Sequence, residues 1–174
     1  MEIKRLEKNI YAGKAFTARY QTNGYYDICA SEQGFLLEYR PFETPTERSF
    51  DDVFFGAWLE DPIAFGAFEH GSLIGFVEGS MEHWNNRFRI SNICVFDRIK
   101  RSSGTGSMLM EVIQKAARSA GARMIVLETQ SCNETAIAFY RKNGFSIIGF
   151  DLFAYSNRDP ERHEVRIEMG KKLE

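Results

Sequence analysis

The sequence predicts an α/β fold, more broadly an α+β fold with a mixed sheet and helices on both sides. Strand-like segments, rich in aromatic and β-branched residues, recur along the chain. One of them, Arg89–Phe96, precedes a segment with a helical repeat, Gly104–Ala120, whose apolar residues share one face. Another strand, Met124–Thr129, follows that helix. This order predicts a right-handed crossover between parallel strands.

Further strands are expected before the central helix. Met1–Leu6 is a short candidate, and Phe16–Ala30 is expected to form a hairpin with Phe35–Phe42, turning at Gln33-Gly34. Two more strands and a tight turn should then lead into Arg89–Phe96: Ile63–Glu69, the turn at His70-Gly71-Ser72, and Leu73–His83. Together these predict an antiparallel meander.

The segment after the hairpin is predicted to leave the strand conformation and to form a short helix. Pro41 and Pro45 are expected to end the strand, because proline donates no hydrogen bond to a sheet. Ser49 resembles a helix cap, so a short helix is predicted over Phe50–Leu59. It would carry three apolar residues inward: Val53, Phe54 and Trp58.

The C-terminal part predicts a second crossover unit. Asn133–Asn143 has helical spacing and ends at Gly144. Two strands follow, Phe145–Tyr155 and Glu164–Met169, with a polar loop at Ser156–Glu161 between them. We expect residues 1–174 to form one domain.

The composition limits the partners. The chain has 22 basic and 24 acidic residues without a block of like charge, so neither nucleic acid nor an anionic membrane is expected as a partner. Cys29, Cys94 and Cys132 are odd in number and widely spaced, which predicts neither a disulfide framework nor a metal site. Without an apolar segment for secretion or membrane insertion, a cytoplasmic protein is expected. The aromatic content of 14% leaves room for a homodimer interface.

A glycine-containing loop opens the central helix. Gly104 and Gly106 lack Cβ atoms, so an anion can approach the free amides at the positive end of the helix dipole. A phosphate or pyrophosphate is the expected occupant, with Arg101 as its counter-charge. The alternative is an ordinary Ser/Gly loop that caps the helix.

Two motifs together resemble the acetyl-coenzyme A (acetyl-CoA) signature of the GNAT family of N-acetyltransferases. The first is Arg101-x-x-Gly104-x-Gly106, and the second is Asn133-x-x-Ala-x-x-Phe-Tyr140-x-x-x-Gly-Phe. The resemblance covers roughly Ile63–Phe150. Several short segments are also similar to streptothricin acetyltransferases, which acetylate the β-lysine portion of that antibiotic: Ser31–Phe35, Leu127–Gln130, Asn133, Tyr140, Gly144-Phe145 and Gly149–Tyr155.

This resemblance implies a GNAT-like sheet of about seven strands, an acetyl-CoA cosubstrate without a metal, and a small-molecule amine acceptor. The strands Arg89–Phe96 and Met124–Thr129 would splay apart to admit the pantetheine arm, and Tyr140 would protonate the departing thiolate. The implied cofactor-binding residues are Ile93, Cys94, Val95, Arg101, Ser102, Ser103, Gly104, Thr105, Gly106, Ser107, Asn133 and Tyr140.

The acceptor amine also needs a base. A lysine-like amine has a pKa of about 10.4 and is mostly protonated at neutral pH, so a carboxylate must accept its proton before attack. Glu82 is the first choice as the second catalytic residue. Four others are alternatives: Glu78, His83, Glu128 and Asp151. The streptothricin-type pattern usually has an acidic residue where this chain has Ser91, which leaves the base and the substrate open.

Other functions stay open. A dinucleotide-binding oxidoreductase would use Gly104-x-Gly106 and Glu128, but Leu109 stands at the third glycine position and Asp97–Ser103 is too long for a tight turn. A nucleotidase would need a Lys-Ser/Thr pair after the glycines. A non-catalytic acyl-CoA binding module would not need Tyr140. Among acceptors, a polyamine, an amino-acid derivative or a protein N-terminus are alternatives to streptothricin. We expect the N-terminal hairpin and Ser156–Glu161 to bind the acceptor.

Overall fold

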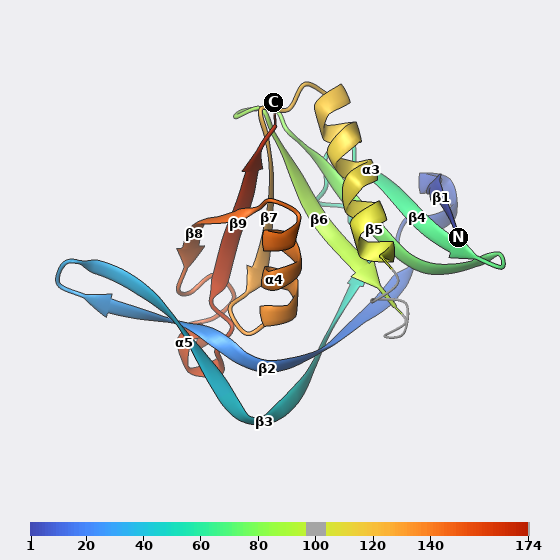
Figure 1. Cartoon of the computed structure of the whole chain (residues 1–174). Coiled ribbons are helices and arrows are strands. Elements are labelled where there is room, and N and C mark those ends of the chain that lie inside the picture. Colours follow the sequence, from blue (N-terminus) through green and yellow to red (C-terminus); the bar gives the residue numbers. More distant parts are fainter. Residues whose placement is uncertain (97–103, 174) are drawn as a thin grey trace. The chain divides into compact units, whose positions relative to one another are not determined.

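A seven-stranded mixed sheet and a separate two-stranded sheet make up the fold (Figure 1). The computed structural model describes residues 1–96 and 104–173. The strand order is β1-β4-β5-β6-β7-β9-β8 in the larger sheet, and β2 pairs with β3 in the smaller. The bounds are β1 Glu2–Arg5, α1 Lys8–Tyr11, β2 Ala15–Ser31, β3 Gly34–Val53, β4 Ile63–Glu69, β5 Ser72–Glu82, β6 Arg87–Val95, α3 Thr105–Ser119, β7 Met124–Gln130, α4 Glu134–Lys142, β8 Ser146–Asp151, α5 Asp159–Arg162 and β9 Arg166–Lys172. The predicted mixed sheet with flanking helices is confirmed.

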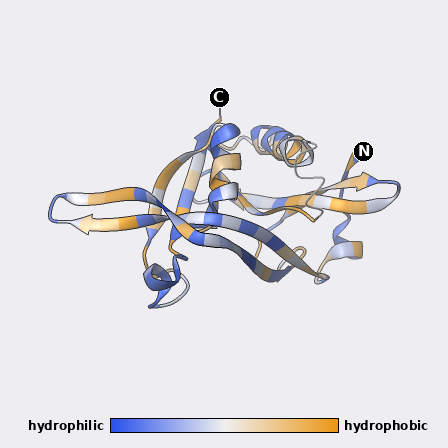
Figure 2. Cartoon of the chain, turned by 60° about the horizontal axis from the view of Figure 1, so that its bottom comes forward, coloured by the Kyte–Doolittle hydropathy of each residue, from blue (hydrophilic) through white to orange (hydrophobic). Residues whose placement is uncertain are grey.

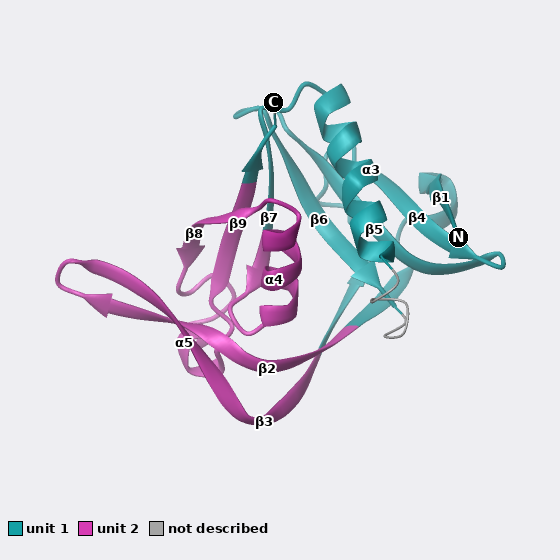
Figure 3. Ribbon diagram, viewed as in Figure 1, with its two compact units in different colours: residues 1–18, 49–127, 171–174 teal, residues 19–48, 128–170 magenta. Residues whose placement is uncertain are grey.

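The chain divides into two compact units (Figure 3). Unit 1 contains residues 1–18, 49–127 and 171–174, and unit 2 contains residues 19–48 and 128–170. Four strands pass from one unit to the other along the chain: β2, β3, β7 and β9. A single domain over residues 1–174 remains a prediction.

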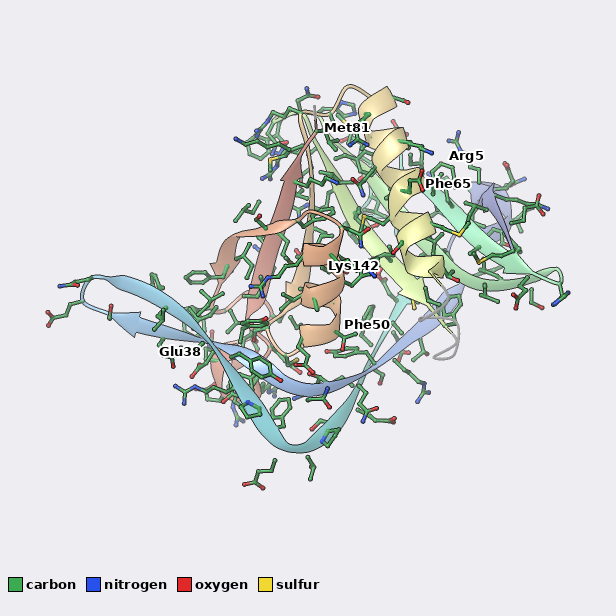
Figure 4. All side chains as sticks on the ribbon, in the orientation of Figure 1. Arg5, Glu38, Phe50, Phe65, Met81 and Lys142 are labelled. Atoms are coloured by element: carbon green, nitrogen blue, oxygen red, sulfur yellow. The ribbon has the colours of Figure 1, made fainter. Side chains whose placement is uncertain are left out.

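Unit 1 contains the predicted meander and the central helix. β1 pairs antiparallel with β4, with Arg5 opposite Phe65 (both labelled in Figure 4), and β4–β5 and β5–β6 are also antiparallel. α3 packs against β4, β5 and β6. On its predicted apolar face, Leu109, Ile113 and Ala117 are buried, Val112 and Ala116 are partly buried, and Met108 and Ala120 are exposed. Gly121 ends the helix with a left-handed φ of 73°.

Aromatic side chains form much of the core of unit 1. The Phe16 ring lies 5.2 Å from that of Phe54 and 4.8 Å from that of Phe76, centroid to centroid, and Phe54 and Phe76 are 4.3 Å apart. Tilted and edge-on contacts of this kind add to the apolar burial. The core therefore fixes residue 54, which follows β3, against strand β5.

The predicted break and helix after the hairpin are wrong. β3 runs through both prolines to Val53, and its only neighbour in the two-stranded sheet is β2. Since its other edge needs no amide donors, proline is tolerated there. Phe54 is buried as predicted, but Trp58 is 68% exposed and Phe50, labelled in Figure 4, is 45% exposed. In place of the expected helix, residues 50–53 end strand β3 and turns follow them.

Unit 2 contains residues 19–48 of the long β2–β3 hairpin, helix α4, and the paired parts of β8 and β9. Buried and exposed residues alternate along most of β2, and Figure 2 shows hydrophilic and hydrophobic residues in short bands along the hairpin. This alternation is typical of a strand with one covered face. The predicted loop at Ser156–Glu161 contains the start of the short helix α5.

Candidate active site

The N-terminus of α3 is where anion binding was predicted. Gly104 is the cap residue, with a left-handed φ of 86°, and no side chain hydrogen-bonds to this cap. A Cβ at Gly104 would meet no described atom within 4 Å. The helix dipole and first-turn amides favour a phosphate group at such an end.

The predicted loop residues fall into two groups. One group forms the cap and first turn of α3: Gly104, Thr105, Gly106 and Ser107. The other lies outside the described residues: Arg101, Ser102 and Ser103. Thr105 Oγ1 also contacts the sulfur of Met1 at 3.2 Å, so this side chain is engaged within unit 1.

Strand β6 carries the three residues expected beside the pantetheine arm. Its parallel ladder with β7 begins at Arg87–Met124 and ends at Ile90–Leu127. β6 itself continues to Val95, so Ile93, Cys94 and Val95 lie beyond the last pair.

Glu82 does not lie with these residues. It is opposite Arg87 in the β5–β6 ladder, whereas Ile93 is opposite Val77. At about 3.3 Å per residue, Arg87 and Ile93 are about 20 Å apart along β6. Glu82 therefore belongs to the turn end of the hairpin.

The surroundings of Glu82 also make it a weak base. Its carboxylate forms ion pairs with Arg87, at 2.9 Å, and with Arg89. Partial burial alone would raise the pKa of Glu82, but hydrogen bonds from Arg89 and Asn85 and both guanidinium charges hold the pKa below its ordinary value. The geometry therefore favours a structural role for this carboxylate.

Glu78 has the opposite character. It is fully buried on β5, opposite Asn92. Its Oε2 accepts the main-chain N–H of Phe55 at 2.6 Å, and its Oε1 accepts the Ser91 hydroxyl at 3.1 Å. Burial raises the pKa of Glu78 despite these hydrogen bonds. A carboxylate with a raised pKa is a better proton acceptor.

An amide links Glu78 to a second carboxylate. The Asn92 side chain hydrogen-bonds to Glu78, and its Nδ2 donates to Asp52 Oδ2 at 3.0 Å. Asp52 Oδ1 accepts the N–H of Val53 at 2.8 Å. Asp52 is only partly buried, so unit 1 contains one enclosed and one more accessible carboxylate joined by one amide.

Helix α4 in unit 2 carries the other two predicted residues. Asn133 caps this helix, and its Oδ1 accepts the N–H of Ala136 at 3.2 Å. Tyr140 is 7% exposed, with its ring 6.1 Å from that of Phe145. Asn133 and Tyr140 are seven residues apart, which is about two turns of helix.

The first turn of α4 also anchors the β2–β3 hairpin. Glu134 Oε1 accepts the main-chain N–H of Asn23 at 2.7 Å and its Nδ2 at 2.8 Å, while Oε2 accepts the Tyr39 hydroxyl at 2.6 Å. Farther along the helix, Arg141 donates to the Tyr26 hydroxyl at 2.8 Å. Both hairpin strands are therefore tied to the helix that contains Asn133 at its cap.

Two other candidate bases lie beside a cation in unit 2. Arg166 is 3.7 Å from Glu128 and 3.7 Å from Asp151. Glu128 Oε1 also accepts the Tyr155 hydroxyl at 3.2 Å. Shared pairing with one guanidinium partly offsets both negative charges. The remaining candidate, His83, is exposed after β5.

Sequence reasoning missed the partners of Glu78. The sequence does not mark Phe55 as a site residue, and it places Asp52 in a predicted helix. Ser91 stands out only because streptothricin acetyltransferases usually have an acidic residue there. Their proximity depends on the pairing register of β5 with β6 and on the turn after β3, which no short motif specifies. The acidic pair Asp51-Asp52 was the one available signal.

A sequence model of the Acetyltransferase (GNAT) family matches residues 30–145, about two thirds of the chain. This range contains both the Arg101–Gly106 motif and the Asn133–Phe145 motif. The chain belongs to the GNAT family.

Two curated relatives are streptothricin acetyltransferases. The one from Escherichia coli is 34% identical over 80% of this chain and 78% of its own length. The one from Streptomyces lavendulae is 32% identical over 86% of this chain and 84% of its own.

Solved GNAT structures agree over nearly the whole chain. Nourseothricin acetyltransferase superimposes with a TM-score of 0.78 at 26% identity, covering 99% of this chain and 98% of its own. A second structure, described as a streptothricin acetyltransferase from Bacillus anthracis, was determined in complex with acetyl coenzyme A. It gives a TM-score of 0.71 at 27% identity, covering 99% and 97%.

This GNAT protein is an acetyl-CoA-dependent N-acetyltransferase. The glycine cap and the first-turn amides of α3 have the chemistry that suits the anionic part of that cosubstrate. Within residues 1–96 and 104–173, no group of three or more His, Cys, Asp or Glu side chains could hold a metal ion. No helix in the described part of the chain is long and apolar enough to cross a membrane.

Proposed function

We propose that the chain acetylates a primary amine of a streptothricin-type antibiotic, at its β-lysine portion, and thereby confers antibiotic resistance. The similarity to two streptothricin acetyltransferases over at least 80% of the chain carries this proposal. The nourseothricin acetyltransferase fold supports it over 99% of the chain. A polyamine, an amino-acid derivative or a protein N-terminus are the alternative acceptors.

The coenzyme is proposed to bind through the residues of the two sequence motifs and of strand β6. The cap and first turn of α3, together with Arg101, Ser102 and Ser103, would hold the diphosphate. Ile93–Val95 on strand β6 would lie along the pantetheine arm. Asn133 would bind the arm through its side-chain amide. Acetyl-CoA supplies the acetyl group as a thioester.

Glu78 is the proposed general base in place of Glu82. The acceptor reaches the enzyme as an ammonium ion, so its attack requires loss of a proton. Burial raises the pKa of Glu78, which strengthens it as a proton acceptor, whereas two arginines neutralise Glu82. The partly exposed carboxylate of Asp52 would help to attract the cation.

Tyr140 is the proposed proton donor to the leaving sulfur. A tyrosine hydroxyl can supply a proton there as the thiolate departs. The hairpin β2–β3 and the segment Ser156–Glu161 are the proposed acceptor-binding surface. The carboxylates Glu128 and Asp151 give this part of unit 2 groups that suit a cationic acceptor.

A free-thiol release assay with acetyl-CoA and a panel of amines tests the acceptor. The panel contains streptothricin, a polyamine, a free amino acid and a peptide with an unblocked N-terminus. We expect streptothricin to give the highest kcat/KM, with mass spectrometry locating one acetyl group on the β-lysine portion. A higher kcat/KM for another amine would reject streptothricin as the substrate.

A further inference from the structure

The proposed base cannot itself contact the acceptor. Glu78 is fully buried, and its carboxylate is surrounded by the Phe55 amide, the Ser91 hydroxyl and the Asn92 side chain. A proton from a bound ammonium must therefore pass through an intermediate group. Ser91 is partly exposed, so it is accessible both to Glu78 and to the surface.

A β-bulge gives Ser91 this position. The β5–β6 register pairs Glu78 with Asn92 and then Gly79 with Ile90, which leaves Ser91 as the extra residue. Bulges re-aim a side chain at the point where they occur. The neighbouring glycine is required, because a Cβ at Gly79 would lie 2.5 Å from the carbonyl oxygen of Arg89.

Among the described partners of Glu78, Ser91 also has the suitable chemistry. A hydroxyl can accept one proton while donating its own, whereas the Phe55 amide only donates and Asn92 is held by Asp52. The Ser91 Oγ lies 3.1 Å from Glu78 Oε1 and 3.2 Å from the Glu78 main-chain oxygen. Rotation of one O–H bond can direct its proton to the carboxylate.

We propose that Ser91 is a catalytic proton relay between the acceptor ammonium and Glu78. An N–H bond of the ammonium breaks as an O–H bond forms at Ser91 Oγ, and the original hydroxyl proton moves to Glu78 Oε1. The acceptor becomes a neutral amine, Glu78 becomes a carboxylic acid, and Ser91 is again a neutral hydroxyl. This inference rests on the proposed role of Glu78 as the base.

The pH dependence of kcat/KM for the acceptor tests the relay in wild type, Ser91→Ala and Ser91→Thr. Loss of the relay should lower the high-pH plateau of Ser91→Ala by about 100-fold, while Ser91→Thr retains most of it. Ser80→Ala is the control, since Ser80 is a buried serine of the same ladder. Acetyl-CoA affinity should match wild type in all three variants, and thermal unfolding should show that each variant is folded.

A merely structural Ser91 gives a different profile. Its hydrogen bond favours the charged form of Glu78, so removing it would raise the pKa of Glu78 and move the acidic limb to higher pH. Asp52 is the nearby charged group that also acts on this pKa. A shifted limb with an unchanged plateau would overturn the relay. The relay is tested by the ratio of the kcat/KM plateaus of wild type and Ser91→Ala, measured with whichever amine the enzyme acetylates best. An error in the proposed substrate would appear separately, in the amine panel.

Discussion

Phe55 donates its main-chain N–H to Glu78 at 2.6 Å from a left-handed backbone conformation, with φ 53°. A bulky residue rarely adopts this conformation, which costs roughly 1–3 kcal/mol and persists only where packing imposes it. The Phe55 side chain is buried, as is that of Phe54 before it. The core of unit 1 thus holds a strained turn that directs one amide at one buried carboxylate, as expected of a functional site.

Glu78→Gln should increase stability at neutral pH. Because burial raises the pKa of Glu78 in the folded protein, the unfolded chain binds fewer protons between the ordinary and the raised value. The wild type therefore loses stability as the pH rises through that interval, and the glutamine variant does not. Urea unfolding across this pH range measures the difference. An equal pH dependence in both proteins would contradict the raised pKa.

Glu82→Gln should have the opposite effect on stability. The pKa of Glu82 is lowered in the folded protein, so its contribution is present above the ordinary value and disappears as the pH falls through the lowered one. We expect a loss of roughly 1–2 kcal/mol at neutral pH, allowing for partial exposure of the arginine pairs. The same urea series measures it. A loss that persisted in strong acid would indicate a packing effect.

Gly104→Ala should weaken acetyl-CoA binding, and Gly121→Ala is its matched control. Both glycines have a positive φ at an end of α3, and a Cβ on either would meet no described atom within 4 Å. Both variants should lose about 1 kcal/mol of stability from the backbone conformation. Only Gly104→Ala should raise the Kd for acetyl-CoA in calorimetry. Equal Kd values would remove the anion site from this helix end.

Two substitutions of Asn133 should distinguish its role in helix capping from its proposed role in coenzyme binding. Asn133→Asp keeps an oxygen for the Ala136 amide but loses the side-chain NH₂, whereas Asn133→Ala loses both. We expect only Asn133→Ala to lose about 1 kcal/mol of stability, while both variants raise the KM for acetyl-CoA. A wild-type KM in Asn133→Asp would limit Asn133 to capping.

Glu134→Ala should loosen the β2–β3 hairpin. It removes the acceptor for Asn23 and Tyr39, one residue on each strand. Hydrogen exchange should accelerate in both strands, and the KM for the acceptor should rise more than that for acetyl-CoA. Arg141→Ala, which removes only the contact with Tyr26, is the comparison and should have a smaller effect. Unchanged exchange in β2 and β3 would show that other contacts hold the hairpin.

The sequence predicted the parts of this fold that depend on local pattern. The repeat of α3, the helix α4 and the β4–β5 hairpin all follow from residues close together in the chain. The predicted strand is shorter than β3 because proline usually ends a strand that has neighbours on both sides. In the described residues, β3 pairs only with β2. Propensity cannot supply that information, since it is a property of the assembled sheets.

For the candidate site, too, the sequence predicts only the parts that depend on short motifs. Gly104 and Asn133 belong to short motifs, whereas choosing between Glu78 and Glu82 required the register of two strands. Both carboxylates lie on β5, and only the structure distinguishes a buried acid beside Ser91 from one paired with arginines. A sequence gives the acidic residues, but their environments come from long-range packing.

Turnover of Glu78→Gln and Glu82→Gln, measured side by side by thiol release at saturating acetyl-CoA and neutral pH, tests the central assignment most directly. We expect Glu78→Gln to lose about 100-fold or more in kcat/KM for the acceptor while it still binds acetyl-CoA, and Glu82→Gln to remain within a few-fold of wild type. Near-normal turnover of Glu78→Gln, with the loss appearing in Glu82→Gln, would contradict the account.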